Sequence, residues 1–163
     1  MRGPLLPAPF TSAPGLVRPE WIDSNGHMNL AYFVVLLDWA TDALWDAVGL
    51  GPGHRATGMT TFAAETHTIY KAELHLGEAT TARSLILDLD AKRLHIAHEL
   101  CRAKDGVIAA QQELLFLSID LGTRRVAPWP APIRAGLEAA LASHAAVSRW
   151  DWVGRRVAIP RRP

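Results

Sequence analysis

The fold is decided by residues 23–48, which read DSNGHMN and then LAYFVVLLDWATDALWDAV, with Gly49 directly after them. The second part is largely apolar, and its only charged residues are three aspartates, which recur every four residues. This spacing draws one narrow polar stripe on an otherwise apolar cylinder and is typical of a helix that is buried on most sides. Asn29 suits the N-cap of that helix, and Gly49 suits its C′ position. The sequence therefore predicts a buried helix over residues 30–48.

The loop in front of this helix, residues 23–29, holds carboxylate, amide and imidazole side chains where a helix presents unpaired N–H groups. Those groups and the partial positive charge of a helix N-terminus can stabilise a developing oxyanion. Asp23 is therefore the first candidate for a nucleophile or a general base. An Asp before Ser-Asn-Gly can instead simply form an Asx-turn. The company of His27, Asn29 and the buried helix favours the catalytic role.

The composition is that of one soluble domain with a real core, because 49% of the 163 residues are hydrophobic and 20% are charged. A formal net charge of +1 gives no reason to expect a nucleic-acid partner. The single cysteine, Cys101, excludes an internal disulfide and suits a reducing compartment. Residues 1–14 lack the apolar stretch of a signal peptide, and the aspartates within residues 30–48 argue against a membrane span. We therefore expect a cytoplasmic protein without a membrane partner.

Beyond the helix, from Met59 onwards, the hydrophobic pattern changes to a period of two. The sequence predicts four long strands, at residues 61–76, 80–89, 93–102 and 107–119. Short turns between them, such as Asp105-Gly106, predict an antiparallel meander. One face of that sheet needs a cover, and the buried helix is the only large candidate. The predicted fold class is therefore α+β, with a long buried helix wrapped by a curved antiparallel sheet.

The remaining segments give the expected domain bounds. A flexible leader is expected at residues 1–13, where prolines prevent helix and ladder pairing. A single domain follows at residues 14–150, with a short strand at 15–18 and a helix at about 133–146 after a proline-rich breaker. Residues 151–163 are expected to be a basic tail.

The 23–29 motif is followed by Tyr32 in the first turn of the predicted helix and by Glu65 and Tyr70 on the next strand. With these residues, the stretch 17–119 resembles the hotdog-fold acyl thioesterases, in the branch of the 4-hydroxybenzoyl-CoA thioesterases. The D-x-N-x-H-x-N pattern is also similar to that of plant acyl-carrier-protein thioesterases, in which the Asp, Asn and His positions and a downstream Glu are functional. Residues 21–32, 87–98 and 111–130 further resemble the small thioesterases associated with carnitine dehydrogenase, which hydrolyse betainyl-CoA.

The resemblance implies a hotdog fold and hydrolysis of an acyl-CoA thioester to a free acid and coenzyme A, with betainyl-CoA as a candidate substrate. It implies no cofactor, since coenzyme A enters as part of the substrate. Members of the family pair their sheets edge to edge and have their sites at the dimer seam. The resemblance therefore implies a homodimer, and it leaves a tetramer open. A long unpaired edge strand would also be an aggregation risk, which favours the same conclusion.

The catalytic residues that the resemblance implies are Asp23, Asn25, His27 and Glu65. Asp23 acts as nucleophile or general base, and the others place water or hold the thioester oxygen. Glu65 has this role only on the inward face, since on the outward face it is a solvated strand residue. The substrate-binding candidates are Asn29, Tyr32, Lys92 and Arg93. The two basic residues suit the phosphates of coenzyme A, with solvated surface as the alternative.

The histidines do not predict a metal site. His95 and His98 lie three apart on a predicted strand and therefore point to opposite faces. No pair of His and Cys residues has the spacing of a tight zinc site. The chain has six tryptophans, whose rings could hold a quaternary ammonium group by cation–π attraction, although core packing is the alternative for each of them.

Two rival functions stay open at this point. The first is an enoyl-CoA hydratase or dehydratase on the same fold, in which His27 works with Asp23 or Glu65. The second is a non-catalytic module that binds acyl groups or dimerises. Product analysis separates the first rival from a thioesterase, and ligand-dependent stabilisation without turnover identifies the second.

Overall fold

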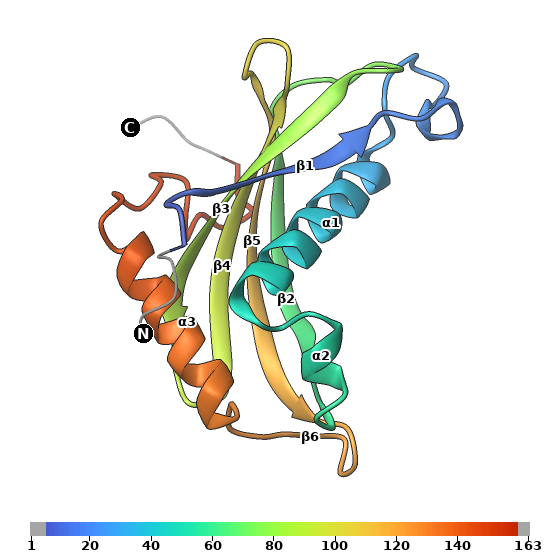
Figure 1. Ribbon diagram of the computed structural model, residues 1–163. Coiled ribbons are helices and arrows are strands. Elements are labelled where there is room, and N and C mark those ends of the chain that lie inside the picture. The colour runs from blue at the N-terminus through green and yellow to red at the C-terminus, as the bar shows by residue number, and fades with distance from the viewer. Residues whose placement is uncertain (1–5, 160–163) are drawn as a thin grey trace.

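The computed structural model describes residues 6–159 and contains a curled antiparallel sheet with the strand order β1-β3-β4-β5-β2, on which β6 pairs with β5. The strands are β1 (Phe10–Leu16), β2 (Met59–Tyr70), β3 (Ala79–Leu89), β4 (Arg93–Arg102), β5 (Ile108–Asp120) and β6 (Arg125–Val126). The helical elements are a 3-10 turn (Pro19–Trp21), α1 (Leu30–Val48), α2 (Pro52–Arg55) and α3 (Ala131–His144). Figure 1 shows α1 lying across one side of the curled sheet, which we call the inner face.

Helix α1 has the bounds that the sequence predicts. The Asn29 side chain accepts a hydrogen bond from the Ala31 N–H at 3.0 Å and caps the first turn. Gly49 ends the helix in the left-handed region, at a φ of 85°, which costs little for a residue without a Cβ. The predicted cap, helix and C′ residue are therefore confirmed.

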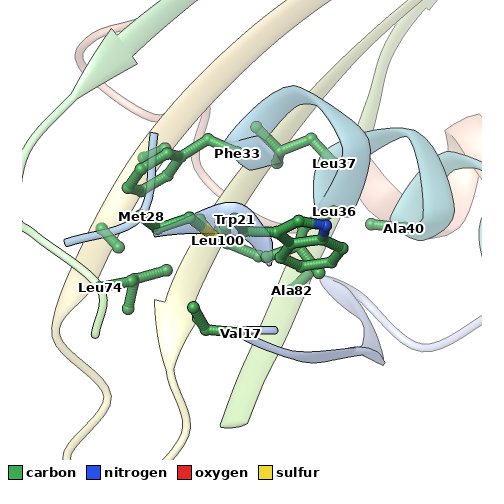
Figure 2. Packing of buried hydrophobic residues seen from close by; sticks show 12 residues of the cluster. Val17, Trp21, Met28, Phe33, Leu36, Leu37, Ala40, Leu74, Ala82 and Leu100 are labelled. Atoms are coloured by element: carbon green, nitrogen blue, oxygen red, sulfur yellow. The ribbon is translucent and has the colours of Figure 1, made fainter. Parts of the chain in front are cut away.

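The core lies between α1 and the inner face, in two clusters. The first surrounds the N-terminal half of α1 and includes Trp21, Met28 and Leu74, which Figure 2 shows packed beside Leu36 and Leu100. The second surrounds the C-terminal half of α1 and joins it to α3. Because Met28 and Leu74 are buried in the first cluster, they hold the segments on either side of them in fixed positions at the surface.

The predicted meander is wrong for the first of its four strands. β2 ends at Tyr70 and pairs with β5 instead of β3, so only β3, β4 and β5 form a meander. Residues 71–78 leave the sheet because the Lys71 and Ala72 N–H groups both bond to the Ala109 carbonyl, after which the chain crosses to the N-terminal end of α1. β2 is thereby left at an edge of the sheet.

The expected leader and tail are both partly packed. β1 begins at Phe10 and pairs with β3, so the leader prediction is wrong for residues 10–13; an edge strand tolerates the prolines that suggested it. Before β1, the carbonyls of Leu6 and Pro7 accept hydrogen bonds from Ser143 Oγ (2.6 Å) and His144 Nε2 (3.0 Å) of α3. Residues 1–5 of the expected leader lie outside the described residues.

The expected tail begins with a packed turn. Trp152 is buried on the side of the sheet opposite α1, the outer face, and its Nε1–H donates to Glu99 Oε1 at 3.0 Å. A solvated tail from residue 151 is therefore wrong for this turn, and residues 160–163 lie outside the described part of the chain. None of the helices within residues 6–159 has the length and apolar character that a membrane crossing requires.

Candidate active site

The loop from Asp23 to Asn29 is a closed hairpin at the N-terminus of α1. Ile22 and Met28 pair as an antiparallel bridge, and within it the Asp23 N–H donates to the His27 carbonyl at 3.1 Å. Gly26 turns the chain at a φ of 81°, where a residue with a Cβ would be strained. The Met28 N–H donates to the Leu74 carbonyl at 2.7 Å, which ties the loop to the segment after β2.

The two oxygens of the Asp23 carboxylate differ in their contacts. Its Oδ1 accepts a hydrogen bond from the Asn25 N–H at 2.8 Å, so the Asx-turn that the sequence offered as an alternative is present. Its Oδ2 has no hydrogen-bond partner among residues 6–159, and the side chain is half-buried. The turn therefore fixes the carboxylate in place and leaves one oxygen free for chemistry.

The other residues of the motif surround this carboxylate to different degrees. Asn25 is exposed at the tip of the hairpin. His27 is half-buried, with Nδ1 3.4 Å from the Met28 carbonyl oxygen. Tyr32 stacks on Trp21 with ring centroids 5.1 Å apart, so it supports the hairpin from the first turn of α1.

Two further side chains at this site are not among the residues predicted from the sequence. Glu73 has Oε1 3.7 Å from His27 Nε2 and Oε2 3.8 Å from His75 Nε2. The Nδ1 of His75 also lies 3.5 Å from the Gly26 carbonyl oxygen. Leu74, an apolar residue between two polar ones, is the sequence signal for their position. The prediction of one continuous strand over residues 61–76 conceals the turn of the chain after Tyr70.

Glu65 lies elsewhere in the chain. It pairs with Leu115 of β5, whose neighbours Leu114 and Phe116 are buried in the core on the inner face, so Glu65 projects from the outer face. A β-bulge between Ala63 and Glu65 causes this, since it reverses the alternation along β2. Within one chain, the structure does not bring Glu65 to Asp23.

On the outer face, Glu65 lines a cavity of about 720 Å³. Other polar residues that line this cavity are His67, His95 and Arg93. His95 Nε2 lies 2.7 Å from Glu113 Oε1, and the second oxygen of that carboxylate accepts from the Gly154 N–H at 2.7 Å. The cavity therefore lies between the sheet and the turn that follows Trp152.

The predicted phosphate ligands Lys92 and Arg93 are exposed in the β3–β4 hairpin. Arg93 Nε donates to Asp90 Oδ2 at 2.6 Å, and this bond, with the Lys92 N–H bond to the same carboxylate, lowers the pKa of Asp90 to about 2. Arg93 pairs with Leu117, as does Phe62 of β2, so the hairpin lies at the Met59 end of the sheet. The Asp23 loop lies at the other end of β2, where the Tyr70 hydroxyl donates to the Leu30 carbonyl at 3.4 Å.

The predicted orientation of two histidines is confirmed. His98 projects from the inner face, where Nε2 lies 2.9 Å from Thr41 Oγ1 of α1 and Nδ1 lies 2.7 Å from Ser84 Oγ. His95 projects from the outer face toward Glu113. No group of three His, Cys, Asp or Glu side chains within residues 6–159 has a geometry that could hold a metal ion.

A second cavity, of about 730 Å³, lies between α1 and β2 near the C-terminal half of the helix. We call it the α1–β2 cavity. Its aromatic and acidic lining residues are Trp45, Phe62, Phe116, Asp38, Asp42 and Asp46. The pKa of Asp42 is raised by burial and then by the neighbouring carboxylates of the same helix. This cavity and the Asp23 loop are at opposite ends of α1.

Comparison with known proteins decides the family. The family model described as the thioesterase-like superfamily matches residues 17–137. The chain belongs to the thioesterase-like superfamily. It is 35% identical over 145 residues to a betainyl-CoA thioesterase from Pseudomonas aeruginosa, and this match covers 88% of the chain and 91% of that protein. It is 37% identical over 120 residues to an L-carnitine dehydrogenase/betainyl-CoA thioesterase from Agrobacterium fabrum, a match that covers 73% of the chain and only 25% of that longer protein.

Two solved structures have the same fold over nearly the whole chain. A Staphylococcus aureus protein, solved in complex with CoA, has a TM-score of 0.84 at 28% identity, with 98% of both chains covered. A thioesterase-like protein from Pseudomonas putida has a TM-score of 0.76 at 29% identity, with 98% of this chain and 100% of that chain covered. The hotdog fold implied by the resemblance is therefore confirmed. The chain therefore hydrolyses an acyl-CoA thioester. This finding does not support the two rival functions, a hydratase and a non-catalytic module.

Proposed function

We propose that Asp23 is the catalytic carboxylate of this thioesterase and that a second copy of the chain completes the active site. The observation that carries the proposal is the free Oδ2 of Asp23 in a hairpin fixed at the N-terminus of α1. In one route, Oδ2 takes a proton from water while the water oxygen attacks the thioester carbon. In the other, Oδ2 attacks that carbon and water hydrolyses the resulting anhydride. In both routes the carbon–sulfur bond breaks and coenzyme A leaves as a thiol.

The neighbours of Asp23 supply the rest of the chemistry. The Leu30 N–H, which has no acceptor among residues 6–159, and the positive end of the α1 dipole polarise the thioester carbonyl. Asn25 and His27 hold the attacking water or the thioester oxygen from the hairpin, while Asn29 and Tyr32 keep the loop and the helix terminus in register. Glu73 faces His27 and orients its ring, while His75 lies against the second oxygen of the Glu73 carboxylate.

The second copy is inferred from the edge strand β2. Its Tyr70 end contacts the start of α1, and its Met59 end lies beside the α1–β2 cavity, since Trp45 Nε1 donates to Thr61 Oγ1 at 3.0 Å. Antiparallel pairing of two β2 strands about a twofold axis would satisfy the open edge. It would also carry the Asp23 loop of one copy to the α1–β2 cavity of the other, which neither chain achieves alone.

The same pairing gives the basic candidates a place. Lys92 and Arg93 lie at the Met59 end of the sheet, where they can approach the coenzyme A phosphates of a substrate held by the second copy's Asp23 loop. Glu65 lies near the middle of β2, where the twofold axis would pass, but it projects from the outer face, so pairing through β2 alone does not bring it to the Asp23 loop. We place the reaction in the cytoplasm, where the buried thiol of Cys101 stays reduced.

Betainyl-CoA is the substrate that we propose. The support is the name of the Pseudomonas aeruginosa relative, whose match covers most of both chains. The reaction would release betaine, a quaternary ammonium carboxylate, and coenzyme A.

The test is thiol release from a panel of acyl-CoAs that includes betainyl-CoA. We expect Asp23→Asn to lower kcat by about 100-fold or more, because the amide can neither attack nor take a proton. Asp151→Asn, a change at an exposed aspartate near the C-terminus, is the matched control and should keep wild-type activity. If the Asp23→Asn variant had wild-type turnover, Asp23 would not be the catalytic carboxylate, and another residue would have that role.

A further inference from the structure

Arg18 lies on an aromatic base next to the Asp23 hairpin. Its Cζ is 5.1 Å from the centroid of the Trp21 ring and 5.2 Å from that of the Trp39 ring. Trp21 is buried and stacks on Tyr32 of the first turn of α1, so the base is fixed to the helix. A guanidinium that contacts two rings is restricted in the directions in which it can point. Arg18 is therefore held in place although it is exposed.

The aromatic base is joined to the start of α1 by backbone hydrogen bonds. The Trp21 carbonyl accepts from the N–H of Asn29, the cap of α1, at 2.9 Å, and the Trp21 N–H donates to the Arg18 carbonyl at 3.1 Å. Arg18 and Asp23 are five residues apart in the chain, so their Cα atoms are at most about 18 Å apart. Arg18 therefore belongs to the same end of α1 as the Asp23 carboxylate.

The positive charge of Arg18 is not neutralised by the part of the chain that the structure describes. Among residues 6–159, no carboxylate forms an ion pair with it, and its guanidinium donates no hydrogen bond. Arg93 differs, because its guanidinium is already bound to Asp90. Stacking uses the faces of a guanidinium and leaves the N–H groups at its edge free, where they match the oxygens of a phosphate.

We propose that Arg18 binds a phosphate group of the coenzyme A moiety and holds the substrate on the same copy as the Asp23 that acts on its thioester. This inference rests on the proposed function, because that function places the thioester at the Asp23 hairpin. In coenzyme A the pantetheine arm separates the phosphates from the sulfur, so a phosphate ligand belongs near the hairpin but outside it. Lys92 and Arg93, in contrast, can approach the phosphates only from the second copy.

The test compares two substrates with the same acyl group, one with phosphates and one without. The first is the acyl-CoA that gives the fastest thiol release in the panel, and the second is the S-acyl pantetheine thioester. We expect Arg18→Gln to raise the KM for the acyl-CoA about ten-fold at unchanged kcat, because the lost charged hydrogen bond is equally strong in the ground state and the transition state. The KM for the acyl-pantetheine should stay at the wild-type value.

Two controls accompany the comparison. The planar amide of glutamine can still lie on the indole rings, so Arg18→Gln removes the charge and keeps the packing. Arg134→Gln, a change at an exposed arginine of α3, should leave the KM of both substrates unchanged. Added KCl should raise the wild-type KM for the acyl-CoA more steeply than that of Arg18→Gln, because salt screens the contact between charges.

The other outcomes separate the inference from the proposed function. An unchanged KM of Arg18→Gln for the acyl-CoA would overturn the inference. Equal losses on the two substrates would also overturn it, because they would show that Arg18 only supports the hairpin. Wild-type turnover of the acyl-pantetheine by Asp23→Asn would instead contradict the proposed function, since Arg18 has no part in binding that substrate.

Discussion

At the scale of single residues, His98 ties the helix to the sheet. Ser84 Oγ donates to its Nδ1, and its Nε2–H donates to Thr41 Oγ1, whose own proton goes to the Leu37 carbonyl 3.1 Å away. The neutral ring therefore has both nitrogens satisfied between β3 and α1. Burial lowers the pKa of His98 to about 3, because a charged imidazolium would lose its hydration there.

This pKa predicts a loss of stability in acid. Below about pH 6.5 the unfolded chain takes up a proton on His98, whereas the folded chain does so only near pH 3. Within that window the free energy of unfolding should fall by about 1.4 kcal/mol per pH unit from this residue, with the lowered pKa of His144 adding in the same direction. Urea unfolding of wild type and His98→Asn between pH 7 and pH 4 measures it. The variant should have a shallower slope, and equal slopes in the two proteins would contradict this account of His98.

At the scale of elements, the segment after β2 depends on one anchor. Leu74 is fully buried in the first core cluster, and its carbonyl accepts from Met28, so it holds the 71–78 segment against the Asp23 hairpin. Two residues further on, Leu76 is 58% exposed. The two leucines provide a matched pair, because the same truncation removes core contacts at one position and surface contacts at the other.

We expect Leu74→Ala to lower the free energy of unfolding by about 2–5 kcal/mol, through lost burial and an unfilled space. Leu76→Ala should change it by about 0.5 kcal/mol or less. Urea unfolding measures both changes in the free energy of unfolding, from the shift of the midpoint at an unchanged m-value. Similar costs at the two positions would mean that the 71–78 segment is not anchored as described.

The bounds of helices and strands can be predicted from local sequence, whereas the pairing of distant strands cannot. The bounds of α1 and β4 follow from caps, turns and periodicity, all of which are local. The pairing of β2 with β5 joins residues that are far apart in the chain, and no local period contains it. The bulge at Ala63/Glu65 reverses the alternation of β2, so the face of Glu65 could not be found from a strict period of two.

The same division holds within the site. The hairpin from Asp23 to Asn29 could be predicted, because its turn residues, its cap and its helix are consecutive. Glu73 reaches His27, and His75 reaches the Gly26 carbonyl, because Leu74 is buried in the same cluster as Met28, which is a tertiary contact. The roles of Asn25, Lys92 and Arg93 stay predictions from the resemblance.

At the scale of the whole molecule, we propose that the active site is shared between two copies of the chain. The Asp23 hairpin is at the Tyr70 end of β2, and the α1–β2 cavity is at the Met59 end. A twofold dimer through β2 would produce two equal sites, each with a hairpin from one copy and a cavity from the other. Loss of activity on dilution below the dimer dissociation constant would follow from this arrangement.

The most direct measurement uses a heterodimer of two inactive variants. One copy carries Asp23→Asn and a first tag, and the other carries Asp42→Trp, whose ring fills the cavity, and a second tag; tandem purification isolates the mixed dimer. One of its two sites then combines an intact hairpin with an intact cavity, so we expect about half of the wild-type thiol release, while each variant homodimer is inactive. A mixed dimer as inactive as its parents, or an active Asp42→Trp homodimer, would contradict an active site shared between two copies.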